Sequence, residues 1–153
     1  MSRTRVLFLC IGNSCRSQMA EGFARSYGGD VIEPLSAGLA PAFMVDPTTH
    51  KIMLEKNIDL GGAYPKSLPT ALAEGCDLIV NMSGETLPAR TSIAVEEWSV
   101  RDPVLMSEEQ HREIANEIEQ LVMQLILKLR ASPGRKADPH SIRFDSKRKT
   151  PRK

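Results

Sequence analysis

The feature that most constrains the fold of this chain is a short apolar run that is followed by a tight polar loop and then by a helical pattern. Residues 5–10, RVLFLC, have the continuous hydrophobicity of a strand that is buried on both faces. A loop follows at residues 11–16, IGNSCR, and residues 17–29, SQMAEGFARSYGG, then carry apolar side chains at helical spacing before a Gly-Gly stop. A buried strand that leads directly into a helix is typical of an α/β fold.

The rest of the chain continues this alternation. Further strands and helices are predicted in turn over residues 30–38 (strand), 46–60 (helix), 70–75 (helix), 76–83 (strand), 91–100 (strand) and 107–130 (helix). The last helix is the clearest, because its apolar side chains form one stripe: Ile114, Ile118, Leu121, Val122, Leu125 and Leu129. Such an alternation predicts an open four-stranded parallel sheet with helices on both faces.

Length and charge predict how the chain is divided. Its 153 residues, 41% of them hydrophobic, are enough for one domain with a core, which we expect to span residues 1–130. A basic tail, residues 131–153, then carries eight Lys or Arg against two Asp among many Pro and Ser residues. We interpret this tail as a solvated extension, so nucleic acid is not an expected partner.

The cysteines indicate a reducing compartment. The chain has three, Cys10, Cys15 and Cys76, an odd number at irregular spacing that does not make a disulfide framework. No stretch resembles a signal peptide or approaches the ~20 apolar residues of a membrane span, so the cytoplasm is predicted and a membrane is not. The histidines are scattered and are interpreted as surface residues: His50, His111 and His140. Without a histidine pair near Cys10 and Cys15, neither a metal nor a cofactor is predicted.

The loop after the first strand has the composition of an anion-binding site. Ligands of open parallel sheets bind outside the carboxyl ends of the strands, and this loop lies there, before a helix N-terminus. Gly12 permits a close approach of the backbone, and Asn13 tolerates positive φ. Arg16 would grip two oxygens of a tetrahedral oxyanion. The predicted substrate-binding residues are Ile11, Gly12, Asn13, Ser14, Cys15, Arg16 and Ser17.

Cys10 enters this loop and is the predicted nucleophile. The positive potential that holds an anion also stabilises a thiolate. Ser17 is placed to donate a hydrogen bond to the sulfur. Cys15 is interpreted as a loop-packing residue that can oxidise with Cys10, so these two are the predicted redox pair.

The motif CIGNSCRS at residues 10–17 resembles the active-site loop of the low-molecular-weight protein tyrosine phosphatases, which share their fold with the thioredoxin-coupled arsenate reductases. Further segments agree in order, so that the resemblance covers residues 4–130: SAG at 36–38, DLIVNM at 77–82 and WSVRDP at 98–103. The resemblance implies a phosphatase-I-like fold. It also implies that Cys10 is the nucleophile, Arg16 the phosphate clamp and Asp102 the general acid.

The sequence departs from both branches of this family. The phosphatases that it resembles carry aromatic residues after the Asp-Pro, where this chain has Val104 and Leu105. The reductases have two more cysteines at and beyond the end of the third strand, where this chain has Ser83 and no later cysteine. Cys76 precedes that strand, which puts it about 20 Å from the active-site edge at ~3.3 Å per residue.

From these features we predict a cysteine-dependent phosphomonoesterase that forms a phosphocysteine intermediate from a phosphorylated protein or a small phosphomonoester. The alternative is an arsenate reductase that uses an external small thiol, glutaredoxin or thioredoxin, because CIGNSCRSQMAEG and SAG look closer to that branch. A second alternative is a non-catalytic oxyanion-binding module. The joint presence of Cys10, Arg16 and Asp102 argues against it.

Overall fold

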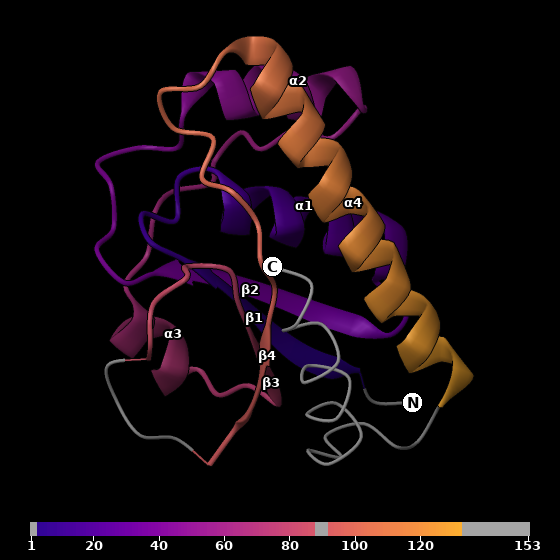
Figure 1. Cartoon of the computed structure of the whole chain (residues 1–153). Helices are drawn as coiled ribbons and strands as arrows, with labels where there is room; N and C mark the ends of the chain where they lie inside the picture. The colour runs from indigo at the N-terminus through magenta and orange to yellow at the C-terminus, as the bar shows by residue number, and fades with distance from the viewer. Residues whose placement is uncertain (1–2, 88–91, 133–153) are drawn as a thin grey trace.

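A four-stranded parallel sheet is the centre of the protein (Figure 1). The computed structural model describes residues 3–87 and 92–132. The strands pair in the order β2-β1-β3-β4, with the bounds β1 Thr4–Cys10, β2 Ile32–Gly38, β3 Leu78–Asn81 and β4 Ala94–Glu97. The helices are α1 Arg16–Gly28, α2 Pro47–Glu55, α3 Leu68–Ala73 and α4 Glu108–Ala131. The predicted open parallel α/β sheet is confirmed.

β1 is a central strand whose side chains alternate between two cores. Val6 and Phe8 join the larger core, which includes residues of α1 and α4. Leu7 and Leu9 join the smaller core, which includes residues of α3. Figure 1 shows α3 on the other side of the sheet from α1 and α4. The unbroken apolar run of the first strand follows from this burial on both faces.

The helix ends differ in part from the sequence prediction. α4 begins as predicted, because Ser107 and Gln110 form a capping box at its N-terminus. α2 ends at Glu55 rather than at residue 60, since Asn57 has a φ of 64°, which an α-helix does not continue. α3 begins at Leu68, two residues earlier than predicted. β4 is shorter than predicted, at residues 94–97 rather than 91–100.

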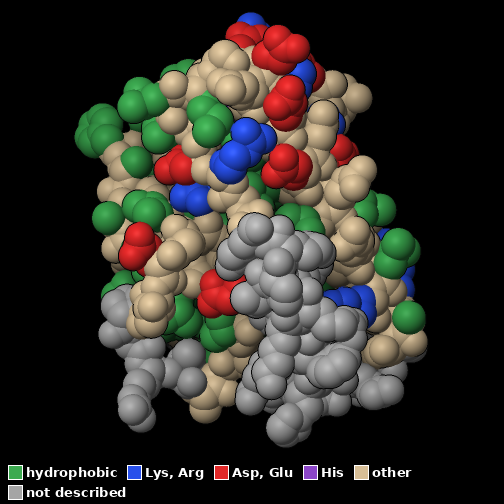
Figure 2. Space-filling view, viewed as in Figure 1, with side chains coloured by type: hydrophobic (Ala, Val, Ile, Leu, Met, Phe, Trp, Pro, Cys, Tyr) green, Lys and Arg blue, Asp and Glu red, His purple; other side chains and the backbone are tan. Residues whose placement is uncertain are grey.

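Charged side chains gather where α2 meets the start of α4, at the top of the face in Figure 2. Arg112 of α4 forms an ion pair with Glu55 of α2 at 2.7 Å, and Lys51 forms one with Glu108 at 3.0 Å. Exposed pairs of this kind are individually weak, because water screens them. Together they mark the line along which the two helices meet beside the carboxyl edge of the sheet.

The domain boundary predicted at residue 130 stays a prediction. α4 runs to Ala131, and the predicted basic tail lies, from residue 133 onward, outside the described residues. Across the part of the chain that is described, none of the helices is long and apolar enough to cross a membrane.

Candidate active site

The loop between β1 and α1 lies at the carboxyl edge of the sheet, as predicted. Three backbone N–H groups of the segment after β2, those of Ala40, Ala42 and Asp46, donate to carbonyls of this loop at 2.8–3.1 Å. Asn13 has a φ of 52°, the left-handed conformation that its residue type tolerates. These contacts hold the loop in one shape.

Gly38, the last residue of the SAG motif, leaves room for the loop. A Cβ at this position would lie 2.7 Å from the carbonyl oxygen of Ile11 and 2.8 Å from the backbone nitrogen of Asn13. Both distances are well inside van der Waals contact, so any side chain here would displace the loop. The requirement for glycine explains why the motif belongs with the active site although it lies on another strand.

Cys10 ends β1, and a directed chain of hydrogen bonds leads to its sulfur. Lys66 donates its backbone N–H to Asn13 Oδ1 at 2.8 Å. Because this N–H can only donate, the amide oxygen of Asn13 must face it, and Asn13 Nδ2 then donates to Ser17 Oγ at 2.7 Å. Ser17 Oγ lies 2.9 Å from Cys10 Sγ, and its hydroxyl proton is free to be donated to a thiolate there. Such a donor stabilises a thiolate.

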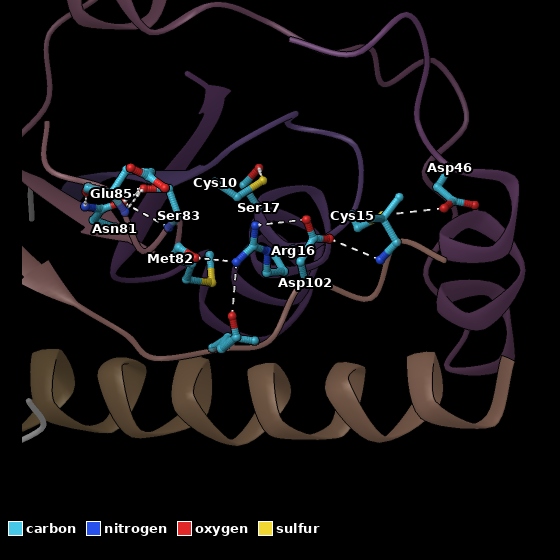
Figure 3. Close-up of polar contacts among 12 residues, drawn as sticks. Cys10, Cys15, Arg16, Ser17, Asp46, Asn81, Met82, Ser83, Glu85 and Asp102 are labelled. Carbon is cyan, nitrogen blue, oxygen red and sulfur yellow. Dashed lines mark hydrogen bonds and ion pairs between the residues drawn. The ribbon is translucent and has the colours of Figure 1, made fainter. Parts of the chain in front are cut away.

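Arg16 is held in place by the chain segments that follow β3 and β4. Its Nη1 donates to the carbonyls of Met82 at 2.6 Å and Val100 at 3.0 Å. Its Nη2 lies 3.5 Å from Asp102 Oδ2, and Figure 3 shows the guanidinium between this carboxylate and Met82. Two carbonyls accept hydrogen bonds from Nη1 and so fix the plane of the guanidinium. An oxyanion can therefore be bound by the other N–H groups of Arg16.

Asp102 lies in the segment after β4 and faces the same cavity as Cys10. Its side chain is 45% exposed, and its Oδ1 accepts a hydrogen bond from the N–H of Val104 at 3.1 Å. The cavity is about 230 Å³ and is lined by Cys10, Ile11, Gly12, Ser14, Cys15, Arg16, Ala42, Asp102 and Val104. None of these described lining residues is aromatic. The arrangement puts a nucleophile, a cation and an acid around one small space.

Two of the predicted binding residues do not line this cavity. Asn13 and Ser17 are fully buried behind the loop, where Ser17 contacts the sulfur of Cys10 and Asn13 contacts Ser17. The other predicted site residues line the cavity. Within residues 3–87 and 92–132, there is no group of three or more His, Cys, Asp or Glu side chains that would hold a metal ion.

Cys15 belongs to a polar cluster that the sequence analysis missed. Its sulfur donates to Asp46 Oδ2 at 3.6 Å (Figure 3), and the hydroxyl of Thr49 lies near it. Burial raises the pKa of the Cys15 thiol to about 12. Thr49 Oγ1 in turn lies 2.9 Å from His111 Nε2. We call these four residues, Cys15, Asp46, Thr49 and His111, the Cys15 cluster.

The interpretation of His111 as a surface residue is wrong. It is 1% exposed, because the first turns of α4 pack on α2, and this burial lowers the pKa of its imidazole. The sequence held a signal for this: His111 lies three residues before Ile114 and so extends the buried stripe of α4 by one turn. His50 is half-buried, and His140 lies outside the described residues.

The predicted position of Cys76 is confirmed. It lies just before β3, and the N–H of the next residue, Asp77, donates to the carbonyl of Arg5 at the opposite end of β1 from Cys10. Ser83 follows β3 at the active-site edge, where its Oγ donates to Asn81 Oδ1 at 2.7 Å and accepts from the N–H of Glu85 at 3.0 Å (Figure 3). A turn built on a serine hydroxyl therefore stands where the resemblance to the reductases would place a cysteine.

Comparisons with known proteins agree with this geometry. The family model for low molecular weight phosphotyrosine protein phosphatases matches residues 5–137. A protein named glutaredoxin arsenate reductase, from Synechocystis sp., is 35% identical over 129 residues, which cover 82% of this chain and 98% of that protein.

Two solved structures extend the comparison. An arsenate reductase in the phosphate binding state has a TM-score of 0.76 and 34% identity, with 82% of this chain and 98% of that chain covered. A low molecular weight protein tyrosine phosphatase from T. tengcongensis has a TM-score of 0.71 and 29% identity, with 82% and 99% covered. Both chemistries are thus found among proteins that are similar to this chain.

Proposed function

The chain belongs to the low molecular weight phosphotyrosine protein phosphatase family, and from this premise we propose that it is an arsenate reductase that draws its electrons from an external thiol or glutaredoxin. The observation that carries the proposal is the small size of the cavity, about 230 Å³, whose described lining residues are not aromatic. A small oxyanion needs no aromatic wall, whereas an aryl phosphate gains from ring stacking. The names of the similar proteins support arsenate reduction better than the phosphomonoesterase that we predicted from the sequence.

The first step is a displacement at arsenic. The thiolate of Cys10 forms the S–As bond as one As–O bond breaks, and Asp102 gives a proton to the departing oxygen, which leaves as water. Arg16 and the loop N–H groups hold the other three oxygens. Asp102 matters here because hydroxide is a poor leaving group unless it is protonated.

The second step reduces arsenic. A second thiol attacks the sulfur of Cys10, and a disulfide forms as the S–As bond breaks. The electron pair of that bond stays on arsenic, which passes from As(V) to As(III) and leaves as arsenite. External thiol or glutaredoxin then reduces the disulfide and restores Cys10. The cytoplasm is the expected location, because it supplies such thiols.

Phosphomonoester hydrolysis is the second candidate, and the position of Asp102 favours it. Cys10 would form a phosphocysteine with the help of Arg16 and Asp102, and Asp102 would then act as a base toward the attacking water. A phosphorylated protein or a small phosphomonoester would then be the substrate.

One assay separates the two candidates. Purified protein is given either arsenate with glutathione and glutaredoxin, or p-nitrophenyl phosphate, and arsenite and nitrophenolate are measured. We expect arsenite formation that depends on the thiol, with only slow phosphate ester hydrolysis. Fast hydrolysis without arsenite would overturn the reductase proposal in favour of the phosphatase.

Asp102→Asn tests the general acid in either reaction. We expect a rate loss of about 10²-fold or more with phenyl phosphate, and a much smaller loss with p-nitrophenyl phosphate, whose leaving group needs no proton. Arsenite formation should fall as it does for the poor leaving group. Asp59→Asn, at an exposed carboxylate outside the cavity, is the matched control. Equal losses with both esters would remove Asp102 from this role.

A further inference from the structure

Three residues of the Cys15 cluster are buried beside the nucleophile, and Asp46 is half-buried, yet neither step of the proposed reaction uses them. Cys15 lines the same cavity as Cys10. All three cysteines of the chain are free thiols in the structure. A cysteine that only fills space in the loop would need no polar partners. The Cys15 thiol, in contrast, is buried and hydrogen-bonded to a carboxylate, and a threonine and a histidine lie behind it.

Arsenate reduction requires a second sulfur atom near Cys10. Cys76 lies at the opposite edge of the sheet, and a serine occupies the end of β3. Of the two remaining cysteines, Cys15 is therefore the one at the active-site edge. It is separated from Cys10 by four residues of one loop, so the two can meet through a local change, whereas Cys76 would have to leave the far end of the sheet.

Asp46 is fixed with one oxygen directed at the Cys15 thiol. Its Oδ1 caps α2 by accepting the N–H of Thr48 at 2.8 Å, and its backbone N–H donates to the carbonyl of Ser14 at 3.1 Å. Its Oδ2 accepts the hydrogen bond from Cys15 Sγ at 3.6 Å. A carboxylate held at both its backbone and one side-chain oxygen is well placed to take a proton with the other.

We propose that Cys15 is the second thiol of the reduction, with Asp46 as its general base; this proposal rests on the arsenate reductase activity proposed above. Asp46 Oδ2 takes the proton of Cys15 as Cys15 Sγ attacks Cys10 Sγ. The S–S bond forms, the S–As bond breaks, and its electron pair leaves with arsenite. External thiol or glutaredoxin enters only afterwards, to reduce the Cys10–Cys15 disulfide.

The surroundings of Cys15 suit this order of events. The high pKa of its thiol, about 12, keeps it neutral at rest, so it does not repel the incoming oxyanion. Thr49 lies near the sulfur, and its hydroxyl is held in place by the contact with His111. A disulfide requires the two Cα atoms to come within ~7 Å, so the loop closes on itself and loses the oxyanion site until it is reduced.

A single-turnover experiment tests the proposal. Fully reduced full-length protein, freed of external thiol, is mixed with excess arsenate; arsenite is then measured and the disulfide located by peptide mass spectrometry. We expect one arsenite per chain and a Cys10–Cys15 disulfide. Cys15→Ser should release no arsenite under these conditions but should turn over once glutathione is supplied. Cys76→Ser, the matched control, should behave as the wild type does.

Two readouts separate the possible failures. Arsenite that appears only after a thiol is added to the wild type would overturn the role of Cys15 and leave the reductase activity standing. No arsenite with or without thiol would overturn both. The wild-type peptide map decides the question even if Cys15→Ser does not fold, and Asp46→Asn should slow the single turnover while leaving the rate with excess glutathione much less affected.

Discussion

Cys10→Ser should abolish both arsenate reduction and phosphate ester hydrolysis while the fold stays intact. The hydroxyl of serine is far less nucleophilic at neutral pH than a thiolate, and Ser17 stabilises a negative charge on sulfur that a serine at this position would not carry. The smaller, polar side chain fits the site, because its neighbour there is the hydroxyl of Ser17.

The measurement combines arsenite and nitrophenolate assays with far-UV circular dichroism and thermal unfolding. Cys76→Ser is the control, because that cysteine lies at the other end of the sheet. Activity of Cys10→Ser close to that of the wild type would show that another group attacks the substrate.

Arg16→Lys should lower the rate by about 10²-fold or more, the effect of losing one donor to a developing negative charge. An ammonium group cannot donate to the carbonyls of both Met82 and Val100 and also present a planar pair of donors to the oxyanion. We also expect weaker inhibition by inorganic phosphate, since the same donors bind the resting anion.

The control for this prediction is Arg25→Lys. Arg25 is an exposed arginine of the same helix and forms an ion pair with Glu21 at 2.7 Å. Its replacement should leave turnover and phosphate inhibition unchanged. For Arg16→Lys, kcat and KM are measured separately. A rate close to that of the wild type would mean that the planar pair of guanidinium donors is not needed to bind the oxyanion.

The fold and the cavity could be predicted from the sequence because their signals are local. The apolar run of β1, the loop motif and the start of α1 are consecutive, and the parallel order follows from the alternation of strands and helices. The resemblance to the phosphatases implies that Asp102 is the general acid, and the structure brings its carboxylate to 3.5 Å from Arg16.

The contacts that the sequence did not predict join distant parts of the chain. Nothing in the pattern of residues 46–49 indicates that Asp46 and Thr49 contact Cys15, because that depends on how α2 packs beside the loop. The burial of His111 likewise depends on α4 meeting α2. The end of α2 is predicted too late because Asn57 adopts a left-handed conformation. Most residue types disfavour this conformation, and sequence patterns seldom indicate where it occurs.

The backbone of Lys66 connects the end of β2 to the active-site loop. Its carbonyl accepts the N–H of Gly38 at 2.8 Å, while its N–H donates to Asn13, which leads through Ser17 to the sulfur of Cys10. The segment before it, residues 61–65, does not line the cavity, yet it is joined to the nucleophile through this chain. We therefore expect that lengthening or stiffening that segment changes the reactivity of the thiolate while every residue that lines the cavity stays as it is.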